Sequence, residues 1–578
     1  MRRFGLLLAA AFILVVSVGP MRARGQQPTA SSPDTKTSNP DAVDEGIPVT
    51  SDLVKQRCSS CHKADDKGRL TRISYRRTTP EGWEETIKRM VSLNGVRLQP
   101  DEAREIVRYL ADHHGLAPEE AKPAAFEVEK RQIDYKYTAD KDTERTCTNC
   151  HSMGRVISQR RTKEEWELLI AMHRGYYPLS DFQAFRRLGP PPRDQQPAAD
   201  GRPPDNRHPM DKAVAHLSTA FPLTTPEWSA WAATMRPPRL DGKWAVSGYQ
   251  TGKGPLFGIL TVRTSGKPDS SEFTTEATMT YARSGETVKR NGRAIVYTGF
   301  QWRGRSDAVG SPSNMPWREV LFVDRDWRSA AGRWFTGAYD EFGIDVTLER
   351  VGNDPILLGV TNALIKTGSS QQIRVYGANL PAQLQPADLN LGPGVTVDRV
   401  AGATPDYIEA AVTAAPNAAP GRRDVILAGA SGRAAVAVYN TIDFIKVLPQ
   451  AGLARVGGAN FPKQFQQFEA VAFANGPDGK PDTKDDVELG PVDVTWGIEE
   501  YTATYEDDDK EFVGTIDQTG LFTPNLDGPN PKRRNHANNY GDVWVVATYQ
   551  KEKPLKARAH LLVTVPLYIK FDQPEVSR

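Results

Sequence analysis

The sequence predicts a multidomain fold in which an α-helical domain is followed by three all-β domains, the first barrel-like and the next two immunoglobulin-like sandwiches. A chain of 578 residues is long enough to form several separate hydrophobic cores. Apolar residues recur with a helical period as far as about residue 236, whereas later segments alternate apolar and polar residues in short runs between turn-forming residues. The pattern Cys-x-x-Cys-His occurs twice, and both copies lie in the helical part.

The first 25 residues are typical of a secretory signal peptide. Arg2 and Arg3 precede an apolar run over residues 4–18, and Ala23 and Gly25 supply the small residues of a cleavage site. This run is too short for a stable membrane span. We therefore expect a periplasmic protein cleaved near Gly25, with residues 26–48, which are polar and Pro-containing, as a disordered tether.

The overall charge is nearly balanced, with 73 basic and 71 acidic residues and a formal net charge of +2. Nucleic-acid-binding proteins and proteins of anionic membrane surfaces need a basic excess. The composition therefore favours neither as the main partner, and we expect no nucleic acid and no membrane span.

The two Cys-x-x-Cys-His motifs carry the chemistry: Cys58-Ser59-Ser60-Cys61-His62 and Cys147-Thr148-Asn149-Cys150-His151. This pattern is the attachment signature of haem c, in which both thiols bond to the porphyrin and the adjacent histidine binds the iron. A zinc site or two disulfides is the alternative, but the histidine after the second cysteine in both copies disfavours it. We expect two covalently bound haem c groups in a dihaem cytochrome c domain over residues 49–236.

An amphipathic helix is predicted after the first motif. Thr79 and Pro80 form a typical helix start, and Trp83, Ile87 and Met90 then fall on one face. A second helix is predicted from about residue 100 to just before residue 115. At its end, His113 and His114 are expected to be exposed side chains favoured by the helix dipole, in preference to iron ligands.

The second unit repeats the first. Thr162 and Glu165 form a predicted capping box, and Trp166, Ile170 and His173 follow with the spacing of the first helix. The Pro-rich residues 189–204 predict a loop. A closing helix is predicted over residues 211–221, with three apolar residues facing inward: Val214, Leu217 and Phe221.

The repeat also predicts the iron ligands. His62 and His151 are the proximal ligands, because each is held beside its two thioethers. Met90 occupies the position in the first unit that His173 occupies in the second, so we assign His62 and Met90 to one iron and His151 and His173 to the other. Core packing is the alternative for Met90. Three other residues are rival ligands of the second iron: Met172, His208 and Met210.

Three all-β domains are predicted after the helical domain: a barrel-like domain over residues 237–354, an immunoglobulin-like sandwich over 355–447, and a C-terminal sandwich over 448–578. The tryptophans of the first are expected to be core and interface anchors: Trp244, Trp302, Trp317, Trp327 and Trp334. In the last domain, residues 478–486 are expected to form a solvated hairpin loop in preference to a calcium site, because they do not match an EF-hand. Residues 506–511 are expected to form a solvated turn.

The complete pattern resembles a known family. Two Cys-x-x-Cys-His motifs precede three β domains, and the last domain contains Asn475-Gly476-Pro477-Asp478-Gly479-Lys480-Pro481, Ile498-Glu499-Glu500-Tyr501-Thr502-Ala503-Thr504 and Asn538-Asn539-Tyr540-Gly541-Asp542-Val543-Trp544. Over nearly all of the mature chain, these features resemble the α subunit of quinohaemoprotein amine dehydrogenase.

The resemblance implies a heterotrimer with a β-propeller subunit and a small subunit whose cysteine tryptophylquinone oxidises primary amines to aldehyde and ammonia. Electrons would pass through the haems of this chain to a soluble blue-copper protein or cytochrome c. The quinone needs a cysteine, and all four cysteines here belong to the haem motifs. The amine-oxidising site is therefore expected on a partner, and this chain contributes as the electron-transfer subunit, with no catalytic residues of its own.

Two other functions remain open on the sequence. A dihaem cytochrome c peroxidase would need one iron with an open or removable ligand, and it would not need a long β region. A free-standing dihaem cytochrome could use its β modules to bind another redox enzyme or a surface. Peroxide turnover by the isolated chain distinguishes the first, and purification with or without further subunits distinguishes the second.

Overall fold

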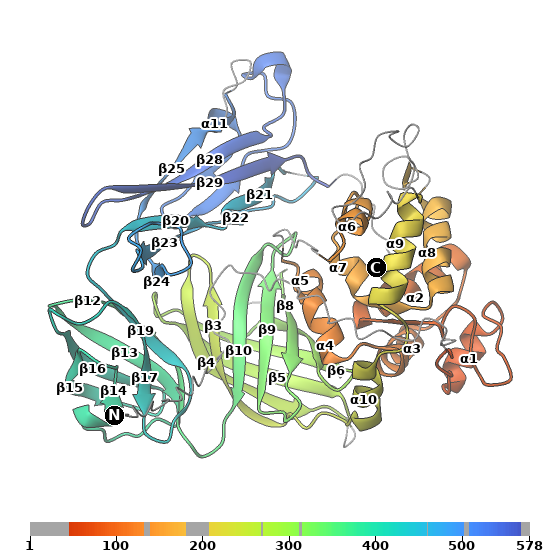
Figure 1. Ribbon diagram of the computed structural model, residues 1–578, viewed down its shortest axis with the longest axis horizontal. Coiled ribbons are helices and arrows are strands. Elements are labelled where there is room, and N and C mark those ends of the chain that lie inside the picture. The colour runs from red at the N-terminus through yellow and green to blue at the C-terminus, as the bar shows by residue number, and fades with distance from the viewer. Residues whose placement is uncertain are drawn as a thin grey trace, which may run out of the picture.

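A computed structural model describes residues 45–131, 139–177, 179–180, 207–266, 270–310, 315–458, 460–501 and 508–567. The predicted signal peptide, the predicted tether as far as residue 44, and the whole Pro-rich segment 189–204 lie outside the described residues. Figure 1 shows a β barrel at the centre, with the helical part on one side and two further β regions beyond its other side and above it.

The helical part consists of two similar units. In each unit a short helix ends at the first cysteine of a Cys-x-x-Cys-His motif, and two longer helices follow. The first unit contains α1 (Asp52–Cys58), α2 (Pro80–Asn94) and α3 (Pro100–His113). The second contains α6 (Lys141–Cys147), α7 (Gly154–Ile157), α8 (Lys163–Tyr176) and α9 (Pro209–Ala220). Between and after the units lie α4 (Pro118–Ala121), η1 (Lys122–Ala124), α5 (Ala125–Val128) and α10 (Pro226–Thr234).

Helix starts form where the sequence predicts them. The hydroxyl of Thr79 accepts a hydrogen bond from the Gly82 amide at the start of α2, and Thr162 accepts one from the Glu165 amide at the start of α8. Trp83 and Trp166, one in each unit, are both fully buried in the cores of their units. The repeated apolar spacing therefore marks the buried face of each helix.

A pseudo-two-fold relation joins the two units. β1 (Arg76–Thr78) and β2 (Gln159–Arg161) form an antiparallel pair centred on Arg77 and Arg160. These two arginines are 83 residues apart, which is also the separation of Trp83 from Trp166. The closing helices α3 and α9 end in the same way. The backbone N–H of Thr78 donates to the carbonyl of His114, which caps α3, and the N–H of Arg161 donates to the carbonyl of Phe221, which caps α9. Equivalent positions of the repeat thus face each other across one axis.

Two expectations about the helical part are wrong. His114 is fully buried, although its neighbour His113 is exposed as predicted. The helix end packs against the barrel, where Thr298 donates its hydroxyl to the Ala111 carbonyl, so tertiary contact overrides the local helix-end preference. The carboxylate of Glu165 does not complete a capping box; it pairs with Arg72 at 2.9 Å and Arg161 at 3.5 Å.

The barrel predicted for residues 237–354 is closed and has eight antiparallel strands in the order β10-β3-β4-β5-β6-β7-β8-β9. The strands are β3 (Gly242–Gln250), β4 (Gly254–Thr264), β5 (Glu272–Tyr281), β6 (Thr287–Tyr297), β7 (Gln301–Ala308), β8 (Trp317–Val323), β9 (Ser329–Thr336) and β10 (Phe342–Arg350). Trp244, Trp302 and Trp334 are buried in its core, and Trp317 and Trp327 pack at its edge, as expected for anchors.

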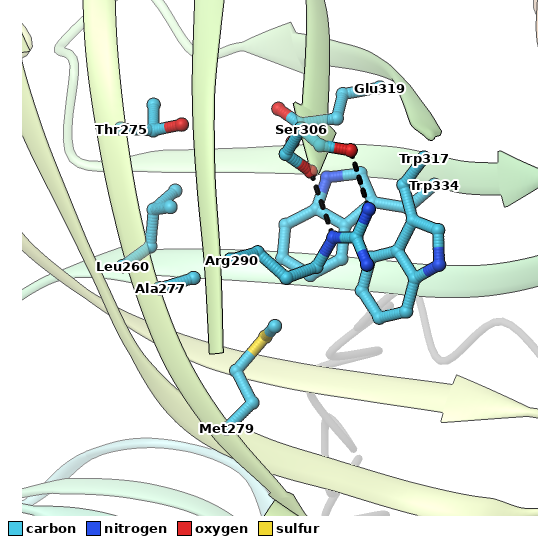
Figure 2. A pocket seen from close by; sticks show the side chains of 9 residues that line it. All are labelled: Leu260, Thr275, Ala277, Met279, Arg290, Ser306, Trp317, Glu319 and Trp334. Carbon is cyan, nitrogen blue, oxygen red and sulfur yellow. Dashed lines mark hydrogen bonds between the residues drawn. The ribbon is translucent and has the colours of Figure 1, made fainter. Parts of the chain in front are cut away.

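The barrel interior also holds two buried titratable residues, Arg290 and Glu319 (Figure 2). The Arg290 guanidinium stacks 4.0 Å from the ring centre of Trp317, and its Nε donates to the Ser306 hydroxyl at 3.2 Å. The Trp302 indole donates to the Glu319 carboxylate at 3.0 Å. Burial lowers the pKa of Arg290 and raises that of Glu319. These groups fill the barrel at one level and leave a cavity of only about 10 Å³.

The next region forms two β sheets, ordered β15-β16-β13-β11-β18 and β12-β19-β17-β14, around one apolar core. The strands are β11 (Ile356–Thr361), β12 (Leu364–Lys366), β13 (Ser370–Ala378), β14 (Leu389–Asn390), β15 (Val395–Ala403), β16 (Tyr407–Ala414), β17 (Gly421–Leu427), β18 (Ser431–Gly432) and β19 (Ala434–Tyr439), with η3 (Pro386–Asp388) before β14.

The C-terminal region has three sheets: β20-β23-β24, β21-β29-β28-β25 and β22-β27-β26. Its elements are β20 (Phe444–Leu448), β21 (Ala451–Arg455), β22 (Gln466–Gln467), β23 (Glu469–Ala474), β24 (Val487–Pro491), β25 (Thr495–Glu500), α11 (Asp509–Phe512), β26 (Gly514–Ile516), β27 (Leu521–Pro524), η4 (Arg534–His536), β28 (Gly541–Tyr549) and β29 (Leu555–Thr564). They enclose a single core that includes Phe468, Phe522 and Val545.

The two polar segments of this region, residues 478–486 and 506–511, compare differently with the prediction. Residues 478–486 form a loop between antiparallel strands β23 and β24, as predicted. Within it, the Thr483 amide donates to Asp486 at 2.7 Å and the Asp478 amide to Asp485 at 3.2 Å. Of residues 506–511, predicted to be a solvated turn, residues 506 and 507 lie outside the described part, and Asp509 is buried and paired with Arg533.

The barrel supports the helical part through polar contacts as well as through a shared apolar cluster. Arg303 of β7 pairs with Glu81 at the start of α2. The backbone N–H of Thr298 donates to Asp112 at 2.6 Å. The first unit is therefore fixed to the barrel at both of its long helices. In the part of the chain that the structure describes, no helix is both long and apolar enough to cross a membrane.

Candidate haem sites

The first Cys-x-x-Cys-His motif lies where α1 ends. Cys58 is the last residue of the helix and is half-buried, Cys61 is exposed, and His62 is half-buried. The Nδ1 atom of His62 lies 2.8 Å from the carbonyl oxygen of Thr71. Histidines that bind metals usually donate their second ring N–H to such an acceptor, which fixes the ring and directs Nε2 to the metal. His62 is thus held in an orientation that suits a proximal ligand.

The second motif also lies where a short helix ends, but its histidine meets the carbonyl of the next residue. Cys147 is the last residue of α6, Cys150 is exposed, and Nδ1 of His151 lies 3.0 Å from the carbonyl oxygen of Ser152. None of the four cysteines forms a disulfide. Burial, with a smaller contribution from Asp140, raises the pKa of the Cys147 thiol to about 12. Burial and Cys61 together raise the pKa of Cys58.

A second imidazole faces His151. The ring centres of His151 and His173 are 6.4 Å apart. Two imidazoles on opposite sides of one metal, each bonded at about 2 Å, have ring centres roughly 6 Å apart. Nδ1 of His173 lies 2.8 Å from the carbonyl oxygen of Leu169, so the ring is again oriented through Nδ1. The spacing and both ring orientations fit one iron bound between His151 and His173.

Burial lowers the pKa of His173 against the opposing hydrogen bond to Leu169, and His151, Arg161 and Arg89 lower it further by charge repulsion. A lower pKa keeps this imidazole neutral, which is the form that binds metals.

Met90 lies half-buried on α2, one turn beyond the buried Ile87. Its position in the repeat is equivalent to that of His173, because both lie seven residues after the buried tryptophan of their unit. The structure thus places Met90 on the helix that packs over the first motif's core, together with Trp83 and Ile87.

The three rival ligands have other surroundings. The sulfur of Met172 lies 3.8 Å from the guanidinium of Arg89 on α2, so it faces the other unit. His208 caps α9, and its Nδ1 accepts a hydrogen bond from the Met210 amide at 3.2 Å. Met210 is buried in the first turn of α9. Among the predicted second-unit ligands, His173 is the one that stands opposite His151.

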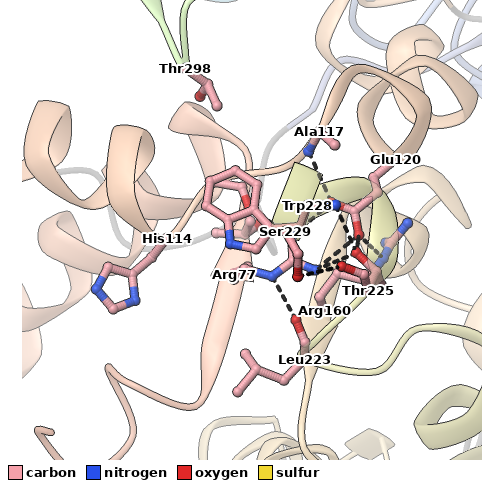
Figure 3. Close-up of polar contacts among 12 residues, drawn as sticks. Arg77, His114, Ala117, Glu120, Arg160, Leu223, Thr225, Trp228, Ser229 and Thr298 are labelled. Carbon is pink, nitrogen blue, oxygen red and sulfur yellow. Dashed lines mark hydrogen bonds and ion pairs between the residues drawn. The ribbon is translucent and has the colours of Figure 1, made fainter. Parts of the chain in front are cut away.

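A buried carboxylate that sequence reasoning missed joins the two units (Figure 3). Glu120 of α4 accepts two hydrogen bonds from Arg77, at 2.7 and 2.9 Å, and one from Arg160 at 3.1 Å. The Thr225 hydroxyl donates to it at 2.8 Å and the Ala117 amide at 2.9 Å. Burial alone would raise its pKa, but the charges of Arg160 and Arg77 outweigh burial and lower the pKa of Glu120 to about 2.

Two further ion pairs cross between the units. Arg72 of the first unit pairs with Glu165 of the second at 2.9 Å, and Arg155 of the second pairs with Glu85 of the first at 3.2 Å. Arg72 and Arg155 are 83 residues apart, so they occupy equivalent positions in the repeat. The repeat offset could have directed attention to these arginines, but no sequence signal identifies their acidic partners.

Each site offers the donors that haem c needs. Over the described ranges, no cluster of three or more His, Cys, Asp or Glu side chains could hold a metal ion. Each site instead combines two cysteines, an oriented histidine and an adjoining apolar helix face. Together these features define a multidomain haem-binding protein in which a two-unit helical part is joined to a β barrel and further β sheets.

Family models identify the protein more closely. Residues 49–189 match "Quinohemoprotein amine dehydrogenase A, alpha subunit, haem binding". Residues 237–351, 354–440 and 445–576 match domains II, III and IV of the quinohemoprotein amine dehydrogenase alpha subunit. The chain belongs to the quinohemoprotein amine dehydrogenase alpha subunit family. It is therefore a subunit of an amine dehydrogenase, an oxidoreductase with partner subunits.

Comparison with other proteins adds little. No curated protein matches the chain. A redesigned β barrel is 17% identical and covers 21% of this chain and 98% of its own, with a TM-score of 0.17. Mouse PcdhgC3 EC1-3 is 11% identical, with a TM-score of 0.16, and the match covers 42% of this chain and 80% of the mouse chain. The Bacteroides ovatus glucan-utilisation protein SGBP-B is 12% identical, with a TM-score of 0.18, and the match covers 58% of this chain and 66% of SGBP-B. Scores this low support no inference.

Proposed function

We propose that this chain is the dihaem electron-transfer subunit of a periplasmic quinohaemoprotein amine dehydrogenase. It receives electrons from a tryptophylquinone on a small partner subunit, where primary amines are oxidised to aldehyde and ammonia, and passes them to a soluble blue-copper protein or cytochrome c. The single observation that carries the proposal is the pair of Cys-x-x-Cys-His motifs at equivalent helix ends, each with its histidine oriented by a backbone carbonyl.

Haem c is attached through Cys58 and Cys61 in the first unit and through Cys147 and Cys150 in the second. The proximal ligands are His62 and His151. The hydrogen bonds from their Nδ1 atoms support this role, because they fix which nitrogen faces the iron.

The distal ligands are Met90 in the first unit and His173 in the second. The spacing of 6.4 Å between the His151 and His173 rings supports the second assignment. The first rests on the equivalent position of Met90 in the repeat and on its half-buried place on α2. A thioether favours reduced iron relative to a second imidazole, so the first haem has the higher potential.

When bound, each haem supplies a one-electron redox centre. His62 with Met90, and His151 with His173, would hold the two irons, and neither iron would then offer an open site for a substrate. That arrangement favours electron transfer over peroxidase chemistry, which needs an open or removable ligand.

Substrate oxidation takes place on other polypeptides. The quinone thioether requires a cysteine, and all four cysteines of this chain belong to the haem motifs. We therefore propose a heterotrimer with a β-propeller subunit and the quinone-bearing subunit. We also propose export through cleavage near Gly25, domain boundaries at residues 49, 237, 355 and 448, and immunoglobulin-like sandwiches for the last two domains.

The experiment is a haem count on the chain produced in a periplasm competent for haem c assembly. Mass spectrometry of the denatured chain should show two covalent haems, and the double variant Cys147→Ala/Cys150→Ala should retain one. Peroxide turnover by the isolated wild-type chain should be at the level of free haem c. A chain with one or no haem, or with rapid peroxide turnover, contradicts the proposal.

A further inference from the structure

The helices that carry the two proposed distal ligands, α2 and α8, meet at a polar contact. Nη1 of Arg89 on α2 lies 3.8 Å from the sulfur of Met172 on α8. These residues are 83 positions apart, the same separation that relates Arg77 to Arg160 and Trp83 to Trp166. A contact between two equivalent positions lies on the pseudo-two-fold axis. Arg89 is therefore at the centre of the interface between the units.

Each partner of this contact is the sequence neighbour of a proposed distal ligand. Arg89 precedes Met90, and Met172 precedes His173. On a helix, consecutive residues share one turn of backbone, so both proposed ligands start within one turn of the Arg89 contact. The guanidinium thus belongs to a contact whose two partners each adjoin a proposed distal ligand in the sequence.

The surroundings hold the Arg89 side chain in place and shield its charge from solvent and salt. Arg89 is partly buried, and its helix is held to the other unit by the ion pair between Glu85 and Arg155 at 3.2 Å. A second ion pair crosses the same interface, with Nε of Arg72 2.9 Å from the carboxylate of Glu165. Charges in partly buried sites interact over several ångströms with little screening by salt, unlike charges at the surface.

We propose that Arg89 is shared by both haem sites and raises the reduction potentials of both irons together. This inference rests on the proposed function, because it needs one distal ligand on α2 and one on α8. A fixed positive charge stabilises the form of a haem with less positive charge, which is the reduced form. A shared cation shifts both potentials in the same direction and preserves the difference that the Met90 and His173 ligands create.

The test is a spectroelectrochemical titration of the full haem-loaded chain. Arg89→Met removes the charge while keeping an unbranched side chain, and it should lower both midpoint potentials. Arg89→Lys retains the charge and should keep most of the wild-type values. Met172→Leu removes the sulfur contact without changing charge and should leave both potentials in place.

Arg174→Met is the matched control. Arg174 follows His173 directly but is exposed, so its charge is screened by solvent, and its removal should shift the potentials much less than Arg89→Met. Unchanged potentials in Arg89→Met, a shift of only one potential, or an equal effect of Arg174→Met overturns the inference. The absorption and magnetic spectra of the wild type report the axial ligands separately, so failure of the ligand assignment is distinguished from failure of the Arg89 role.

Discussion

Replacing Glu120 by Gln should loosen the two haem units from each other. The substitution keeps the size of the side chain but removes the only carboxylate that the structure shows bonded to both Arg77 and Arg160 within the described residues. Both arginines are buried, so each would keep a charge with its acidic partner lost. Breaking a buried ion pair by removing one partner is strongly destabilising.

The magnitude follows from the pKa. Lowering the pKa of Glu120 from 4.5 to about 2 corresponds to about 3 kcal/mol of stabilisation by its ionised form at neutral pH. Because the folded-state pKa lies below the unfolded-state value, this stability is present above pH 4.5 and is lost as the pH falls towards 2. Glu120→Gln should therefore lower the free energy of unfolding by about 3 kcal/mol at pH 7, and the difference from wild type should narrow below pH 4.5.

The assay is denaturant unfolding of the haem-loaded chain followed by haem absorption, because that signal reports the helical units and not the β regions. Glu119→Gln is the control, since Glu119 is exposed on the same short helix. Two results would refute the reasoning: a Glu120→Gln unfolding midpoint equal to that of wild type at pH 7, or a loss of unfolding free energy no greater than that of Glu119→Gln.

Three further predictions concern the ligands, the partner and the C-terminal region. Met90→Ala should abolish the methionine-to-iron charge-transfer band and leave the bis-imidazole signal intact; an unchanged band would place the methionine ligand elsewhere. The isolated oxidised chain mixed with a primary amine should stay oxidised, and haem reduction without another polypeptide would contradict a quinone on a partner. Asp509→Asn should destabilise the C-terminal region by about 3 kcal/mol in thermal unfolding, because it leaves the buried Arg533 guanidinium without that carboxylate; an unchanged transition would show that this ion pair contributes little.

The helical units could be predicted in detail because their sequence signals are local. A capping threonine, a proline in the first turn and apolar residues three and four apart determine where α2 begins and which face it buries. The same spacing in α8 predicted that His173 would take the place of Met90. The approach of His173 to His151 then follows from the way α8 packs on its own unit.

The contacts that could not be predicted join residues that are far apart in the sequence. Glu120 lies 43 positions from Arg77 and 105 from Thr225, and no periodicity connects them. His114 was expected to be exposed on a local argument about helix ends, but it is buried, with its ring 6.2 Å from that of Trp83 and 6.3 Å from that of Tyr109. Asp509 belongs to an acidic run typical of solvent-exposed turns, and its burial depends on Arg533, 24 positions later.

The axial ligation of the two irons tests the central claim most directly. A near-infrared magnetic circular dichroism spectrum of the oxidised, haem-loaded full chain should show two low-spin haems, one with a bis-imidazole signal from His151 and His173 and one with a histidine–methionine signal from His62 and Met90. A high-spin haem, which indicates an open iron site, or a single haem signal would contradict a dihaem electron-transfer subunit.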